Sequence, residues 1–189
     1  MRRTLIALTL LAAFAGPFAW AATDGTPKGW FMAGNKPENY HSGVDADGTA
    51  FLASKSDAAT EGFGTMMQSI KADNYAGKRV RLRASVRSEN VQGWAGLWMR
   101  VDKGTAAFSI DNMASRPIKG TTAWNTYDVV LDVPADATGI AFGTLMESSG
   151  EVWLNHVSLE VVGTDVKPTN IPYGGQEAPS APVNLDFRQ

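Results

Sequence analysis

The sequence predicts an all-β protein, an antiparallel β-sandwich of the jelly-roll type with about nine or ten strands. Three observations carry this prediction. Apolar and polar residues alternate over short runs, which is typical of strands with one buried and one exposed face. Gly, Pro, Asn and Asp separate these runs, and helical periodicity is nearly absent. The 189 residues are 44% hydrophobic and 19% charged, a composition rich enough in apolar residues for one sizeable core.

The strands follow from this alternation. It is clearest over 78–87, where Val80, Leu82 and Ala84 share one face and arginines occupy the other. In 152–162 the apolar residues change parity, so we expect a β-bulge near Asn155 and His156. The other predicted strands are 30–33, 50–54, 65–70, 95–101, 106–110, 127–133 and 140–146.

Residues 1–21 have the pattern of a Sec signal peptide. Two arginines precede an apolar stretch over 5–15 and the small-x-small triplet Ala19-Trp20-Ala21. Gly16 and Pro17 interrupt the stretch before it reaches the about 20 residues of a membrane span, and no cysteine follows for lipid attachment. We expect cleavage after Ala21, no membrane anchor, and a periplasmic or secreted mature protein.

The rest of the chain divides into a domain and a tail. We expect one jelly-roll domain over 22–163 and a Pro/Gly-rich tail over 164–189. The tail ends in a strand-like segment at 183–187, which either pairs with a sheet edge or is loose.

Three segments resemble the galactose-binding-like jelly roll of many carbohydrate-binding modules, namely 75–87, 121–134 and 152–159. In the last segment, Asn155 and His156 stand where two aspartates are usual. Four further segments resemble a group of small exported bacterial domains, some of which are labelled transcriptional regulators. These segments are 62–68, 93–102, 111–113 and 116–118. The resemblance covers roughly residues 29–163 and implies the fold but no settled activity.

Charge and composition exclude several classes of function. Lys and Arg number 17 against 19 Asp and Glu, and no helix-turn-helix pattern is present, so we expect no nucleic-acid partner. The absence of cysteine excludes disulfides, thiolate metal sites and cysteine nucleophiles.

Enzyme signatures are also absent from the sequence. There is no nucleophile elbow, Walker loop, dinucleotide glycine fingerprint or paired-histidine zinc motif, so we expect no catalytic residues, no cofactor and no metal. The Asp45-x-Asp47-Gly48 stretch resembles part of a calcium loop, but it lacks the later ligands and fits a turn better. A two-carboxylate glycosidase is the enzymatic alternative, and the candidates for its two carboxylates are Glu61, Asp111 and Glu147.

The candidate ligand site centres on Trp98 and Arg100, which oppose the apolar faces of Leu97 and Met99. An indole stacks on sugar C–H surfaces, and a guanidinium donates to oxygens, so Trp98 is predicted to stack on a ligand while Arg100 and Asn112 bond to it. The alternative is that Trp98 packs in a second layer and that Asn112 and Arg116 only stabilise a turn. The remaining candidate ligand residues are Gln68, Asp111 and Glu147.

Two further sets of residues have structural interpretations. The arginines at 79, 81, 83 and 87 either bind an anionic partner or pair with acidic residues across strands. We assign the other strand-region tryptophans to the core or to strand ends; they are Trp30, Trp94, Trp124 and Trp153.

The leading functional hypothesis is an exported, non-catalytic binding domain for a carbohydrate or another cell-envelope ligand. The alternative is a protein-interaction module that assists an envelope hydrolase or assembly.

Overall fold

The structure is a computed structural model that describes residues 25–56 and 61–170. Both the predicted signal peptide and the segment 183–187 lie outside these ranges. The elements are β1 (Phe31–Gly34), η1 (Pro37–Asn39), β2 (Tyr40–Val44), β3 (Ala50–Ser54), β4 (Phe63–Lys71), β5 (Lys78–Lys103), β6 (Ala106–Asp111), β7 (Ile118–Val133), β8 (Gly139–Glu147) and β9 (Glu151–Val162).

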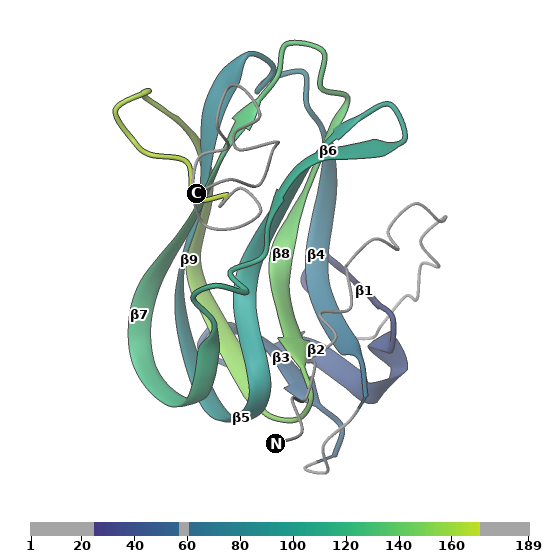
Figure 1. The fold of residues 1–189 in the computed structure, drawn as a ribbon. Helices are drawn as coiled ribbons and strands as arrows, with labels where there is room; N and C mark the ends of the chain where they lie inside the picture. Colours follow the sequence, from purple (N-terminus) through teal and green to yellow (C-terminus); the bar gives the residue numbers. More distant parts are fainter. Residues whose placement is uncertain (1–24, 57–60, 171–189) are drawn as a thin grey trace, which may run out of the picture.

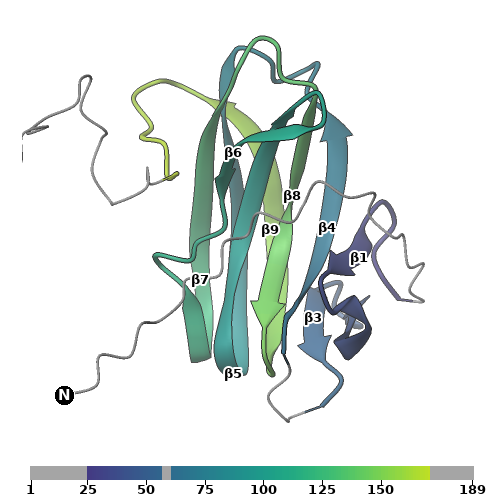
Figure 2. The same cartoon turned by 45° about the vertical axis from the view of Figure 1, so that its right-hand side comes forward.

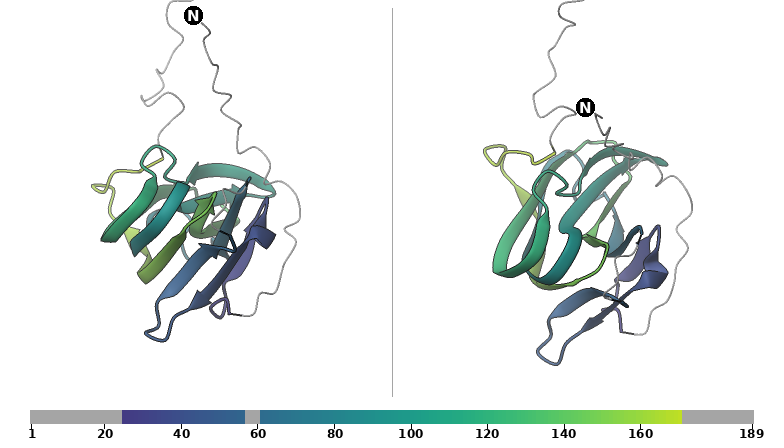
Figure 3. Two further views of the ribbon diagram at one scale, coloured as in Figure 1. Left: turned by 90° about the horizontal axis from the view of Figure 1, so that it is seen from below. Right: turned by 60° about the horizontal axis from the view of Figure 1, so that its bottom comes forward.

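The predicted all-β sandwich is confirmed. All strand pairs are antiparallel, in the order β1-β4-β8-β5-β9-β3-β2, and β6 and β7 also pair with β5. The sheet folds round so that its two halves face each other (Figures 1 and 3). The first layer contains β1, β4, β8, the second half of β5, and β6. The second layer contains β7, the first half of β5, β9, β3 and β2.

Strand β5 belongs to both layers because it spans 26 residues. Its residues 79–89 pair with β9, whereas residues 94–102 pair with β8. Figure 2 shows β7, β5, β8 and β4 side by side, with β6 against one end of β5. The sequence predicted two strands here, at 78–87 and 95–101. They are joined because register shifts between Val86 and Ala95 break the alternation without ending the pairing.

The sequence also missed parts of other strands. Strand β2 was not predicted, and β7 begins at Ile118 rather than at residue 127. Most of the first half of β7 is exposed, so it carries no apolar alternation. In both cases hydrogen bonding to a neighbouring strand, rather than an alternating residue pattern, accounts for the strand.

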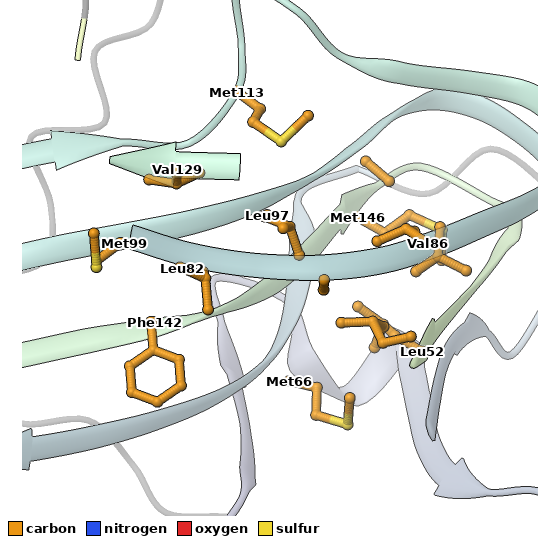
Figure 4. Packing of buried hydrophobic residues seen from close by; sticks show 14 of the residues in the cluster. Leu52, Met66, Leu82, Val86, Leu97, Met99, Met113, Val129, Phe142 and Met146 are labelled. Atoms are coloured by element: carbon orange, nitrogen blue, oxygen red, sulfur yellow. The ribbon is translucent and has the colours of Figure 1, made fainter. Parts of the chain in front are cut away.

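The core lies between the layers and is formed by the faces that the alternation predicted. Val80, Leu82 and Ala84 are each at most 1% exposed. Figure 4 shows Leu52 of the second layer and Met66 of the first among the packed side chains. Burial of such apolar area is the main stabilisation of the fold.

The predicted bulge in β9 is confirmed. Asn155 pairs with Ser85 and Ser158 pairs with Arg83, so β9 carries one extra residue between these two pairs. His156, within this bulge, adopts a left-handed backbone conformation with a φ of 52°.

No helix in the described part of the chain is long and apolar enough to span a membrane.

Candidate functional site

Trp98 lies on the outer side of the first layer, opposite to Leu97 and Met99, but its ring is only 4% exposed. It packs in a small apolar cluster with Ala33, Met67, Ala141 and Leu145. The expectation that this ring faces solvent is therefore wrong. Its partner on β8 is Gly143, which has no side chain, and its Nε1 donates to Thr65 Oγ1 at 2.7 Å. In this conformation the ring of Trp98 has no open face on which a ligand could stack. The stacking role of Trp98 stays a prediction.

Arg100 is also buried on this side, at 7% exposed. Its Nε lies 2.8 Å from Asp102 Oδ1, and its Nη2 donates to Asp102 Oδ2 at 3.0 Å. The guanidinium is thus oriented by a neighbour on its own strand rather than directed into solvent.

Asp111 and Asn112 stabilise the loop between β6 and β7. Arg116 donates through both terminal nitrogens to Asp111, at 3.1 and 2.7 Å, and the Met113 amide donates to the same carboxylate at 2.9 Å. Asn112 Oδ1 accepts from the Ala114 amide at 3.1 Å. The turn-forming alternative for Asn112 and Arg116 is confirmed, and these contacts occupy the carboxylate of Asp111.

The last two predicted ligand residues are separated from one another. Glu147 is exposed on β8 and accepts from Trp94 Nε1 at 2.7 Å. Gln68 follows Met67 on β4 and so lies on the opposite side of the first layer from Trp98. The structure does not bring the six predicted residues into one cleft.

Gln68 instead lines a groove of about 390 Å³ that opens between the two layers. Met66, Phe142 and Leu154 contribute buried apolar surface to it. The other lining residues are Pro27, Trp30, Val44, Gly48, Ala50, Asn155, His156, Val157 and Leu159.

Local structure positions the polar and aromatic side chains of the groove. Trp30 packs edge-on against Phe142, with ring centroids 5.9 Å apart and an interplanar angle of 85°. The bulge in β9 places exposed Asn155 and His156 at the groove, because the extra residue interrupts the alternation there. Gln68 reaches it from β4, so both layers contribute.

The turn that follows β2 contributes Gly48 to the lining of the groove. The Gly48 amide donates to Asp45 O at 2.9 Å, and the Thr49 amide donates to Asp47 Oδ1 at 3.0 Å. The hydrogen bonds from Thr49 lower the pKa of Asp47 below its usual value. The predicted turn at Asp45-x-Asp47-Gly48 is therefore confirmed.

The chemistry of the groove suits recognition of a neutral ligand. It offers an indole, two amides and an imidazole next to apolar walls, and no carboxylate is among its lining residues in the described ranges. Within the same residues, no cluster of three or more His, Asp or Glu is placed to hold a metal ion. An amide and an imidazole can both donate to and accept from hydroxyl groups.

Sequence reasoning missed Trp30 and His156 as groove residues. Trp30 was assigned to the core or a strand end, and it does pack against the core. The only signal for His156 was the change of parity in β9, together with the departure from the usual aspartates at 155 and 156.

The cross-strand pairing of the arginines is confirmed for three of the four. Arg79 contacts Asp132 at 2.7 Å, and Arg83 contacts Asp128 at 2.6 Å. These hydrogen bonds raise the pKa of both guanidinium groups. Arg81 contacts Glu160 at 2.9 Å. Only Arg87 of the four has no ion pair within the described residues.

The fold defines the chain as a jelly-roll domain of the kind found in carbohydrate-binding modules. The CBM22-1 xylan-binding domain of Paenibacillus barcinonensis Xyn10C superposes with a TM-score of 0.50 at 16% identity, covering 80% of this chain and 98% of that one. The enzymatically active domain of bacteriophage CBA120 tailspike protein 4 superposes with a TM-score of 0.55 at 14% identity, covering 71% and 20%. At these identities the similarity shows the fold alone.

One curated protein is similar in sequence. The "Uncharacterized HTH-type transcriptional regulator YbfP" of Bacillus subtilis (strain 168) is 41% identical in an alignment 169 residues long, which covers 86% of this chain and 57% of that protein. The chain thus spans little more than half of its relative. The resemblance to bacterial domains that carry a regulator label is confirmed. No family model matches the sequence.

Proposed function

We propose that this protein is an exported, non-catalytic carbohydrate-binding domain that holds its ligand in the groove between the layers. The observation that carries the proposal is the composition of the groove. It places Trp30 and three polar side chains, Gln68, Asn155 and His156, around one concave apolar surface. Ligand sites are commonly such clefts with a few convergent polar groups.

A neutral sugar matches this surface in both its apolar C–H faces and its polar hydroxyl groups. The C–H faces of a sugar ring bury against apolar walls and an aromatic ring, which here are Val157, Leu159 and Trp30. Its hydroxyl groups both donate and accept, as do an amide and an imidazole. The described lining of the groove has no pair of carboxylates that could perform glycoside hydrolysis.

The similarity of the fold to known binding domains supports this proposal. The Paenibacillus domain of similar fold is named as xylan-binding, and further solved neighbours are named as carbohydrate-binding modules. Residues 1–21 support export through a Sec signal peptide, and we propose a periplasmic or secreted location with an envelope polysaccharide as the ligand.

Calorimetric titration with a panel of neutral oligosaccharides tests the groove. We expect Gln68→Ala and His156→Gly each to weaken binding about 5-fold, the effect of one lost hydrogen bond of about 1 kcal/mol. Glycine suits the left-handed conformation of residue 156, so this variant preserves the bulge.

The control is Lys119→Ala, which changes an exposed side chain of β7 outside the groove. Wild-type protein that binds no member of the panel would overturn the proposed function. Binding that both groove variants leave unchanged would place the ligand elsewhere.

An exposed apolar pair favours a second candidate, a protein-interaction module. Phe108 and Ile110 of β6 are 55% and 40% exposed. Cross-linking in the native host followed by purification tests this candidate. We expect one envelope protein to be retained and to be lost with Phe108→Ser; retention unaffected by this change would count against it.

A further inference from the structure

Arg87 differs from the other arginines on the outer side of the second layer. Its guanidinium carbon lies 3.6 Å from the centre of the Trp153 ring and 5.7 Å from that of Trp124. A guanidinium that stacks flat on an indole keeps its N–H groups at its edge. Arg87 donates no hydrogen bond to any residue that the structure describes, so these donors are available to a ligand.

Trp124 lies on β7 beside this guanidinium, next to a bulge. Val86 pairs with Asn125 and Ser88 pairs with Thr122, so β7 has one extra residue opposite Arg87. Trp124 is 45% exposed within the strand. The assignment of Trp124 to the core or to a strand end is therefore wrong: Trp124 lies inside β7, and it is three residues from inward-facing Tyr127, so it lies on the outer side.

Two carboxylates flank the same surface. Glu89 and Glu151 lie directly opposite each other on β5 and β9, two residues along each strand from the Arg87 and Trp153 pair and therefore on the same side. Like charges in this position are destabilising, so nothing in the packing of the sheet requires both. The neighbouring Asp45 accepts from Trp153 Nε1 at 3.1 Å.

The charges here disfavour an anionic ligand. The single positive charge of Arg87 is outnumbered by the carboxylates of Glu89, Glu151 and Asp45. Free guanidinium donors, free carboxylate acceptors and an exposed indole are together complementary to a chain of neutral sugars, whose hydroxyl groups donate and accept while their C–H faces stack.

We infer that Trp124, Arg87, Glu89 and Glu151 form a second carbohydrate-binding surface, for a neutral polysaccharide, on the outer side of the second layer. The inference builds on the proposed function and extends it, since the groove and this surface would hold one polymer at two places. Two linked sites give a polymer higher avidity than a short oligosaccharide, which can occupy only one of them.

Affinity electrophoresis in gels that contain neutral xylan, β-1,4-galactan or polygalacturonate tests this surface. We expect wild-type protein to be retarded by a neutral polymer and not by polygalacturonate. Trp124→Ala should weaken the retardation 5- to 10-fold, because loss of a stacked aromatic ring removes the principal contact. The matched control is Phe108→Ala, which removes an aromatic ring of similar exposure from β6. Thermal melting of each variant confirms that it is folded.

Each outcome decides between the two sites. Retardation weakened by Trp124→Ala but not by Phe108→Ala supports the second surface. Retardation that Trp124→Ala leaves unchanged, while Gln68→Ala weakens it, overturns the second surface and keeps the proposed groove. Stronger retardation by polygalacturonate than by the neutral polymers overturns the assigned ligand class. No retardation by any polymer overturns both the surface and the proposed function.

Discussion

The position of a single side chain here depends on what lies opposite it. Trp98 faces outward by alternation, yet its ring is enclosed because Gly143 leaves room on β8 and Thr65 offers an acceptor on β4. Thr65 Oγ1 in turn donates to Thr144 O at 2.7 Å. The buried polar atoms of this outer cluster therefore satisfy one another through Thr65.

Thr65→Val should lower the free energy of unfolding by about 2 kcal/mol. The substitution leaves the indole N–H of Trp98 buried without its acceptor, and a buried unpaired donor costs about 1–3 kcal/mol. Thr65→Ser keeps the hydroxyl and should cost about 1 kcal/mol for one lost methyl group. Urea denaturation measures both variants; a serine variant as unstable as the valine variant would contradict the role of the hydroxyl.

Glu151 makes the stability of the fold depend on pH. Burial raises the pKa of its carboxyl group, and the charges of Asp45 and Glu89 raise it further. The folded state therefore binds this proton more tightly than the unfolded chain. The charged carboxylate costs stability above the raised pKa, and the cost disappears as the pH falls below the usual value of 4.5.

Glu151→Gln should consequently stabilise the protein at neutral pH and have little effect in acid. We expect a gain of about 0.5 kcal/mol, the size of one cross-strand pair, or roughly 1–2 °C in Tm at pH 7.5. Thermal melts at pH 7.5 and pH 3.5 check this. An equal gain at both pH values would show that the charge is not the cause.

At the scale of elements, two glycines of β8 have different surroundings. A Cβ at Gly143 would lie 2.2 Å from the Met66 carbonyl oxygen and 2.8 Å from Met67 Cα, so β4 would have to move. At Gly139 the nearest atom would be 3.6 Å away, which is an ordinary contact. Gly143 thus allows β4 and β8 to approach closely beneath Trp98.

Gly143→Ala should therefore destabilise the protein by about 2–3 kcal/mol, the cost of overpacking a tight contact. Gly139→Ala on the same strand is the matched control and should be neutral, or stabilising by about 0.5 kcal/mol, because alanine has less backbone entropy to lose. Urea midpoints compare the two variants. Equal effects would mean that the approach of β4 is not what requires glycine at 143.

At the scale of the whole molecule, β5 joins the two layers. It pairs with β7 and β9 in the second layer and with β8 and β6 in the first, so neither layer is complete without it. The apolar core lies between the layers and is shared by both. Loss of one layer would expose the core face of the other.

We therefore expect a single cooperative unfolding transition. Near-UV circular dichroism, tryptophan fluorescence and calorimetry should report the same midpoint, since tryptophans lie in both layers. Two separate midpoints would show that one layer unfolds independently.

The sequence by itself determined the all-β class, the inward face of the best strands, and the bulge at Asn155 and His156. These features depend on residues close in sequence or on a two-residue period, which a single chain displays directly. The turn at Asp45-x-Asp47-Gly48 belongs to the same group, because its hydrogen bonds are local.

Only the tertiary structure decided where the candidate sites lie. Alternation assigns a side chain to one of two faces, but it does not say what covers that face, so Trp98 is enclosed and Trp124 is exposed against expectation. The groove brings together Trp30, Gln68 and His156, which come from three separate segments of the chain. Their proximity follows from the folding of one sheet onto itself, a long-range event that no local pattern encodes.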